Sequence, residues 1–250
     1  MLSSDDTATL WRNFNGSLFV RIPAGSCVVG ARADDCDAED NERPAHEVTI
    51  APFYLAAWPV TLGEYRQLSD YQIREHSAFA DEHAVNYISC EEADAYLERL
   101  NAARPECERD IRYRLPTEYE WEYACRAGAK SRFCYGDDWD FEQLSEYAWF
   151  GDCAWDVGLR HPQPVARKRA NDFGLWDMHG NVWEWTSDGW ATYHEIARRG
   201  EAMRDSSKRV LRGGSFCHHG RYIRASDRDW YVVSYRHYYT GFRLCMDVLA

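Results

Sequence analysis

A cysteine and two histidines follow one another late in the chain, at Cys217, His218 and His219. Thiolate sulfur and imidazole nitrogen are ligands that copper and zinc prefer in proteins. Adjacent residues of an extended segment point to opposite sides, so three in a row seldom surround one ion. Two interpretations therefore stay open: the three residues bind one metal ion, or their side chains contact separate neighbours. The carboxylates of residues 34–40 lack the regular ligand-and-glycine pattern of a calcium loop, and we expect a solvated loop there.

The 23 residues from Cys217 to Tyr239 are rich in aromatic side chains. They contain three of the nine histidines and five of the sixteen tyrosines, together with Trp230. No helical or alternating period runs through them, which indicates loops. Tyrosine offers a large contact area at low entropic cost, as in antibody paratopes. We therefore expect a surface that recognises a protein or another macromolecular ligand.

The elements that must position this segment are predicted from local patterns. Residues 17–30 resemble two short strands around a turn, and residues 46–55 a further strand. Helix starts are predicted where a hydroxyl residue precedes a glutamate by three positions, at Thr61, Ser89 and Thr117. The second half of the chain is rich in turns and tryptophan. We expect an α+β fold with many irregular loops, in one domain over residues 1–250.

Composition limits the classes of function. The chain has 250 residues and a formal net charge of −12 at pH 7, which argues against nucleic acid or a membrane surface as the partner. The longest apolar stretch, residues 50–60, is interrupted by prolines and falls short of the roughly 18 residues that cross a bilayer. Nine cysteines without a CxxC pair indicate reduced thiols. With no recognisable secretory signal at the start, we expect a cytoplasmic protein.

Five segments occur in the order and at the spacing seen in a known family. They are His46–Ile50 with Pro59–Tyr65, Arg112–Ala124, Gly180–Asp188, Val210–Phe216 and Gly241–Leu244. Over about residues 18–246 the chain resembles the formylglycine-generating enzyme (sulfatase-modifying factor) family. The resemblance implies a C-type-lectin-like fold of the formylglycine-generating-enzyme subtype. Four arginines in these segments lie beside apolar runs and are expected to tie loops together, namely Arg112, Arg114, Arg212 and Arg243.

The resemblance does not settle the function, because one fold hosts several activities. The family's enzymes oxidise a cysteine of a sulfatase peptide to formylglycine, with copper and two cysteines just after the Gly-Gly-Ser motif. Cys217 matches the first of these cysteines, whereas the second has no counterpart and the segment is shorter. Cu(I) prefers two soft thiolates. Because only one of these two thiolates has a counterpart here, a copper oxidase acting on a peptide cysteine is the alternative hypothesis and not the leading one.

The resemblance also implies a structural calcium ion. In relatives, the segment that matches residues 177–184 holds calcium through side-chain and backbone oxygens, which are the donors this ion prefers. The ligands here would be the side chains of Asp177 and Glu184 and the carbonyls of Gly180 and Val182. The other interpretation is that the two carboxylates only accept hydrogen bonds from backbone amides.

A subset of the family consists of the hypervariable proteins of diversity-generating retroelements, whose C-terminal segment is rewritten at adenines of chosen codons. The spacing from Gly213 to Arg243 resembles theirs. Eleven of twelve residues between the fixed arginines have types that arise from an Asn codon by changes at adenine, and Trp230 departs from this pattern. These candidate ligand-binding residues are Cys217, His218, His219, Tyr222, Asp227, Asp229, Trp230, Tyr231, Tyr235, His237, Tyr238 and Tyr239.

The sequence thus favours a non-catalytic binding protein whose contacts lie within residues 217–239. Two forms of this hypothesis stay open: a diversified variable protein, and a constant binding or scaffold protein. The three histidines of the segment predict that binding weakens as they become protonated at about pH 6.

Overall fold

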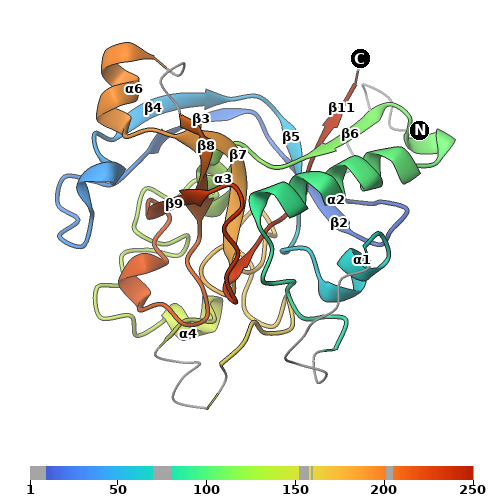
Figure 1. The fold of residues 1–250 in the computed structure, drawn as a ribbon. Helices are drawn as coiled ribbons and strands as arrows, with labels where there is room; N and C mark the ends of the chain where they lie inside the picture. Colours follow the sequence, from blue (N-terminus) through green and yellow to red (C-terminus); the bar gives the residue numbers. More distant parts are fainter. Residues whose placement is uncertain (1–9, 70–79, 152–157, 159, 201–204, 250) are drawn as a thin grey trace.

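A five-stranded antiparallel sheet brings together segments from both ends of the chain (Figure 1). The computed structural model describes residues 10–69, 80–151, 158, 160–200 and 205–249. In the order of the sheet, the strands are β1 (Leu10–Arg12), β2 (Leu18–Ile22), β5 (Phe53–Ala56), β11 (Cys245–Val248) and β6 (Ile111–Arg114). Cys245 of β11 pairs with Leu55 on one side and with Arg114 on the other. The last strand is therefore inserted between two earlier ones.

A second sheet carries the C-terminal segment. In sheet order its strands are β10 (Thr240–Gly241), β7 (Trp183–Trp190), β8 (Asp205–Arg212) and β9 (Arg228–Val232). The short β10 runs parallel to β7, and the other pairs are antiparallel. Residues 217–239 thus comprise most of the β8–β9 connection, which contains a 3-10 turn at Gly220–Tyr222, then β9 and the approach to β10.

The expected strands near the N-terminus form, with one correction. Residues 17–30 contain β2 and β3 (Gly25–Val29), two strands as predicted. The segment expected as one strand over 46–55 is two, β4 (His46–Ile50) and β5, which belong to different sheets. Pro52 lies between them and has no N–H to donate to a ladder, so the pairing is interrupted there. β3 and β4 form a two-stranded antiparallel sheet of their own.

Three of the described helices begin where the sequence predicts. The described helices are α1 (Leu62–Arg66), α2 (Cys90–Ala103), α3 (Glu118–Arg126), α4 (Leu144–Tyr147) and α6 (Tyr193–Arg199), with 3-10 turns at Asp40–Glu42 and Glu106–Glu108. At the predicted starts of α1, α2 and α3, Thr61, Ser89 and Thr117 each form a complete capping box. Such a cap stabilises a helix by about 1 kcal/mol. Thr192 forms a further box, at the start of α6, that we did not predict. No helix of the described residues is long and apolar enough to cross a membrane.

Arginines tie separate parts of the fold together, as expected for three of the four. The Arg212 guanidinium is fully buried against Glu122, and that of Arg243 against Glu184. Arg114 bridges Glu120 and Asp247. Removing one partner of such a buried pair typically costs about 3–5 kcal/mol. Arg112 differs, because its side chain is exposed.

The acidic stretch at 34–40 is not only a solvated loop. Asp35 is buried, and its Oδ2 accepts from Arg224 Nη1 at 3.1 Å. Glu42 accepts from the same guanidinium through both oxygens, at 2.8 and 2.7 Å. Burial alone would raise the pKa of Glu42, but the hydrogen bonds and charge of Arg224 hold it below its usual value. The solvated-loop prediction is wrong for Asp35, because a buried guanidinium requires anionic partners.

The core lies directly beneath the C-terminal segment. Trp183 and Trp185 point to the same side of β7 and pack in one hydrophobic cluster with Leu211 and Phe242. Glu184, between the two tryptophans, accepts a hydrogen bond from Trp121 instead. Tyrosines of the C-terminal segment pack on this cluster from outside, namely Tyr231, Tyr235 and Tyr239. The segment therefore rests on a rigid apolar base.

Candidate ligand-binding surface

Two glycines turn the chain from β8 into the segment of candidate residues. Gly213 and Gly214 have φ values of +93° and +69°, which residues with a side chain rarely adopt. A Cβ on Gly214 would lie 2.5 Å from the carbonyl oxygen of Tyr222. The glycine pair therefore lets the loop pack back on itself and determines where residues 217–222 leave the sheet.

Seven aromatic side chains of the segment meet in one continuous cluster. The ring of Tyr231 stacks on that of Tyr235 with centroids 3.9 Å apart. The hydroxyls of Tyr235 and Tyr239 are 3.1 Å apart. The Tyr239 ring lies 4.1 Å from that of His237 and 5.0 Å from that of His218, centroid to centroid. We call this set the aromatic cluster; its members are His218, Tyr222, Tyr231, Tyr235, His237, Tyr238 and Tyr239.

Every member of the aromatic cluster is half-buried, so each ring has an inner and an outer part. The inner parts of three tyrosines contact the core. Aromatic pairs at these separations contribute about 0.5–1.5 kcal/mol each beyond their buried area. The rings therefore hold one another in place before any ligand arrives, which lowers the entropic cost of binding.

The two histidines of the cluster are neutral at pH 7. Burial lowers the pKa of His218 from 6.5 to about 4, and the nearby His237 adds to the effect. Burial also lowers the pKa of His237. Tyr238 is shifted the other way, because burial, and then Cys217, raise its pKa to about 12. The expectation that these histidines become charged at about pH 6 is therefore wrong for His218.

Trp230 does not join the aromatic cluster. Its ring lies 5.8 Å from that of Trp190, and the Lys208 ammonium sits 4.1 Å from its centroid. Tyr231, the next residue of β9, contacts the cluster instead, because successive side chains of a strand point to opposite faces. The prediction of one surface that includes Trp230 is corrected accordingly.

The other four candidates lie outside the aromatic cluster, each in a different environment. Asp227 is buried 3.4 Å from Arg224, so it belongs to the arginine framework and has no access to a ligand. Asp229 is half-buried, and its Oδ1 accepts from the Trp230 amide at 2.7 Å. His219 is exposed and packs edge-on against Phe141, 5.1 Å away. Cys217 lies half-buried beside the cluster, with its Sγ 3.6 Å from His218 Nδ1.

One ring beside the cluster comes from a distant part of the sequence. Tyr87, just before α2, lies 6.4 Å from Tyr238, centroid to centroid. It is half-buried like the members of the cluster. Nothing in the local sequence marks it, because its position depends on contacts with residues that follow it by about 150 positions.

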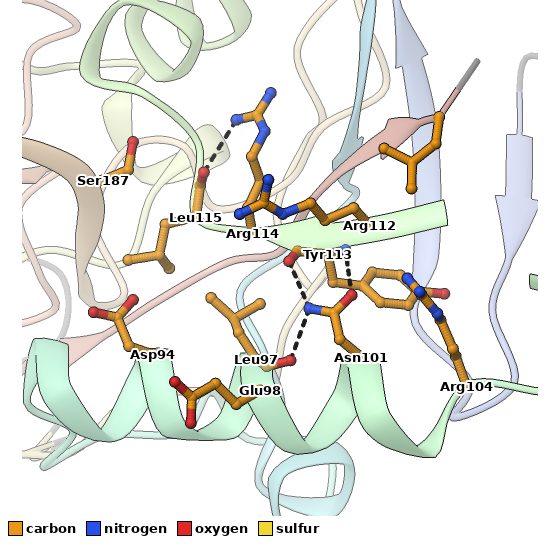
Figure 2. Close-up of a pocket in the computed structure, with 11 residues that line it drawn as sticks. Asp94, Leu97, Glu98, Asn101, Arg104, Arg112, Tyr113, Arg114, Leu115 and Ser187 are labelled. Atoms are coloured by element: carbon orange, nitrogen blue, oxygen red, sulfur yellow. Dashed lines mark hydrogen bonds between the residues drawn. The ribbon is translucent and has the colours of Figure 1, made fainter. Parts of the chain in front are cut away.

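A groove of about 650 Å³ lies between α2 and β6 (Figure 2). Asp94 and Glu98 line it from α2, and Arg112 and Arg114 from β6. Asn101 reaches across, donating to the Tyr113 carbonyl at 2.8 Å and accepting from the Tyr113 amide at 2.9 Å. The amide therefore covers part of the edge of β6, which limits pairing with a foreign strand. The described lining residues include none from 217–239.

The sequence matches a described protein family along nearly its whole length. Residues 7–248 match the FGE-sulfatase family, described as the sulfatase-modifying factor enzyme 1-like domain. The chain belongs to this family. Within it, the chain is 28% identical to the formylglycine-generating enzyme of Mus musculus over 251 residues, covering 81% of this chain and 67% of that protein. It is 30% identical to hercynine oxygenase of Mycolicibacterium smegmatis over 269 residues, covering 92% of this chain and 61% of that protein.

Solved structures agree with the family. PvdO from Pseudomonas aeruginosa superposes with a TM-score of 0.81 at 25% identity, covering 96% of this chain and 98% of that one. Treponema denticola variable protein 1 superposes with a TM-score of 0.74 at 21% identity, covering 94% and 97%. The expected α+β fold of the formylglycine-generating-enzyme subtype is confirmed. The FGE-sulfatase family thus contains enzymes of two named kinds, and its fold also serves a variable protein.

The described residues fit poorly to the copper chemistry of this family. Cys217 Sγ lies 3.3 Å from Ser215 Oγ and 3.6 Å from His218 Nδ1. Burial raises the pKa of the Cys217 thiol, which disfavours the thiolate that copper binds. Cys245 is fully buried in β11, in the other sheet, and Cys153 lies outside the described residues. Within the described part, no group of three histidine, cysteine or acidic residues is placed to hold a metal ion.

The expected calcium ligands do not fit that ion either. Both oxygens of Glu184 accept from Arg243, at 2.7 and 2.8 Å, and one also accepts from Trp121 Nε1 at 2.7 Å. Asp177 Oδ2 accepts from the Ala166 amide at 2.9 Å, which leaves only its Oδ1 without a partner. Burial raises the pKa of Asp177 to about 6. Glu184 is therefore fully engaged, and Asp177 Oδ1 is the single unpartnered carboxylate oxygen that Asp177, Gly180, Val182 and Glu184 offer, whereas calcium takes about 6–8 oxygen ligands.

Proposed function

We propose that this protein is a non-catalytic binding protein that recognises a protein or another macromolecular ligand through the aromatic cluster. The observation that carries the proposal is the continuity of seven half-buried rings across residues 217–239. Rigid tyrosines that are partly buried before binding are typical of interface hot spots. Because the histidines among them are neutral, the surface suits an epitope with apolar groups and uncharged hydrogen-bonding groups.

The edge of β9 favours recognition by side chains over the addition of a strand. β9 ends one side of the described order of its sheet, so a peptide strand added on this side would pair with β9. The Trp230 amide already donates to the Asp229 side chain. The Val232 carbonyl already accepts from the Tyr235 amide at 2.9 Å. With these backbone groups engaged, main-chain pairing with a ligand would be costly.

The finer form of the proposal is that residues 217–239 are diversified. All seven members of the aromatic cluster are histidine or tyrosine, and both types arise from an Asn codon by a change at adenine. Trp230, the residue whose type cannot arise in this way, is the one that faces the opposite side of β9. All seven residues of the aromatic cluster therefore follow the codon pattern, as do four residues outside it, Cys217, His219, Asp227 and Asp229. The fold shared with a variable protein is compatible with this form.

The DNA around the gene tests the diversified form. We expect an imperfect copy of codons 212–243 nearby that differs mainly where the copy has adenine, close to a reverse transcriptase gene. If several kilobases on each side contain neither, the constant form of the binding protein replaces the diversified one.

Binding through the aromatic cluster is tested with peptides selected on the protein itself. A phage-displayed library of random twelve-residue peptides is panned on the full chain, and enriched peptides are resynthesised with a fluorescent label for anisotropy titration. The variant Tyr231→Ala with Tyr235→Ala should weaken binding by at least about 30-fold, because paired hot-spot aromatics are removed. Circular dichroism checks that the variant remains folded.

Trp230→Ala is the matched control. It removes a half-buried ring from the same strand, but from the opposite face. Its affinity for the same peptides should stay within about threefold of wild type, since rings outside a contact contribute little to binding. Full affinity in the double variant, or loss only in Trp230→Ala, would place recognition elsewhere and overturn the proposal.

A further inference from the structure

Tyr87 holds a backbone conformation that tyrosine seldom adopts. Its φ is +58°, in the left-handed region. Glycine or asparagine takes this conformation at lower cost, since a bulky side chain crowds the backbone there. Strained residues of this kind persist when the surrounding structure imposes the conformation, and they gather at functional sites. A large ring at this position indicates that the side chain itself has a use.

Hydrogen bonds join Tyr87 and its two neighbours in sequence to the C-terminal segment. Asn86 Nδ2 donates to the Tyr238 carbonyl at 2.7 Å. The Tyr87 amide donates to the His237 carbonyl at 3.0 Å, and the Ile88 amide to that of Thr240 at 3.1 Å. Asn86 and Ile88 are buried, whereas Tyr87 between them is half-buried. We call residues 86–88 the clamp.

The clamp forms hydrogen bonds with main-chain atoms of the C-terminal segment, not with its aromatic side chains. Together with the Trp183 amide, which donates to the Tyr239 carbonyl at 2.8 Å, it engages every carbonyl from residue 237 to residue 240. The Ile88 carbonyl in turn accepts from Thr240 Oγ1 at 3.0 Å and from Trp185 Nε1 at 2.8 Å. The place of Tyr87 relative to the loop is therefore set without the side chains of residues 237–239.

We propose that Tyr87 is a ligand-contact residue, presented by the clamp at the rim of the aromatic cluster; this inference rests on the proposed function. Its ring extends the surface beyond Tyr238, 6.4 Å away. Because Tyr87 lies outside residues 217–239, it supplies a contact that stays the same when residues of that segment differ. The binding surface thus combines rings from two separate parts of the chain.

The test uses the fluorescent peptides selected by panning on the full chain. Tyr87→Gly removes the ring and also the backbone strain, so the variant should keep a Tm within about 4 °C of wild type. Its affinity for the peptides should fall by at least about tenfold, as expected for truncation of a contacting aromatic. Tyr87→Phe should restore most of the affinity, because it keeps the ring.

Ala127→Gly is the control for strain relief. Ala127 also has a left-handed φ, of +47°, but it ends α3 and belongs to no part of the aromatic cluster. The Ala127→Gly variant should bind the peptides as wild type does.

In the unmodified protein, a peptide carrying benzoyl-phenylalanine should crosslink on irradiation to the fragment that contains Tyr87, as mapped by mass spectrometry.

Two results separate this inference from the proposed function. Wild-type affinity in Tyr87→Gly, together with weak binding by Tyr231→Ala with Tyr235→Ala, would overturn the role of Tyr87 and leave the aromatic cluster as the site. Wild-type affinity in both variants would overturn the proposed function and this inference with it. A Tyr87→Gly variant that fails to fold leaves crosslinking as the deciding measurement, and absence of the Tyr87 crosslink would then refute the contact.

Discussion

Acidification is expected to destabilise this protein through His218. Its ring is surrounded by Trp183, Tyr222 and Tyr239 and lies near His237. Burial, with a smaller contribution from His237, lowers the pKa of His218 from 6.5 to about 4. Below about pH 6.5 the unfolded chain therefore takes up a proton that the folded protein refuses. The stabilising contribution is complete above that pH and is lost as the pH falls towards 4.

The size of the effect follows from the two pKa values. A fall in pKa from 6.5 to about 4 corresponds to at most about 3.4 kcal/mol, of which about 2 kcal/mol is reached at about pH 5. His218→Gln removes this proton uptake. Between about pH 7.5 and pH 5 the variant should lose about 2 kcal/mol less free energy of unfolding than wild type. Urea unfolding at each pH, followed by tryptophan fluorescence, measures the difference.

Equal losses in wild type and His218→Gln would refute this account of the site. An imidazole pKa for His218 of about 6.5 in an NMR titration would do the same, because it would mean that the ring is solvated. The same reasoning predicts that His218 stays neutral between about pH 5.5 and pH 8. Affinity at the aromatic cluster should then show no loss from protonation of His218 over that range.

Two further predictions concern the metals that the family resemblance implies. Glu184→Gln leaves the buried guanidinium of Arg243 without a counter-charge, so the free energy of unfolding in urea should fall by about 3–5 kcal/mol. Neither calcium nor EDTA should change the wild-type Tm. A rise in Tm with calcium would contradict the framework role of Glu184. Cu(I), offered in competition with a chromogenic chelator, should bind wild type no more tightly than Cys217→Ser, and a peptide with a sulfatase-type cysteine should keep its thiol by mass spectrometry. Tighter copper binding by wild type would restore the oxidase hypothesis.

Local sequence determined where α1, α2 and α3 begin and, through the order of its motifs, the fold. The boxes at Thr61, Ser89 and Thr117 are complete within four residues, so no distant contact is needed to predict them. The glycine pair at 213–214 likewise marks a turn by its own backbone freedom. Composition alone also located a dense set of tyrosines and histidines in residues 217–239.

Which of those side chains form one surface was decided only by the tertiary structure. The pairing of β9 with β8 turns Tyr231 towards the aromatic cluster and Trp230 away from it. Asp227 is buried because Arg224 requires anionic partners from several loops at once. Tyr87 joins the surface through hydrogen bonds to residues about 150 positions later. The physical reason is common to all three: exposure, partner and pKa depend on which distant segments pack together, and local sequence patterns carry no information about that.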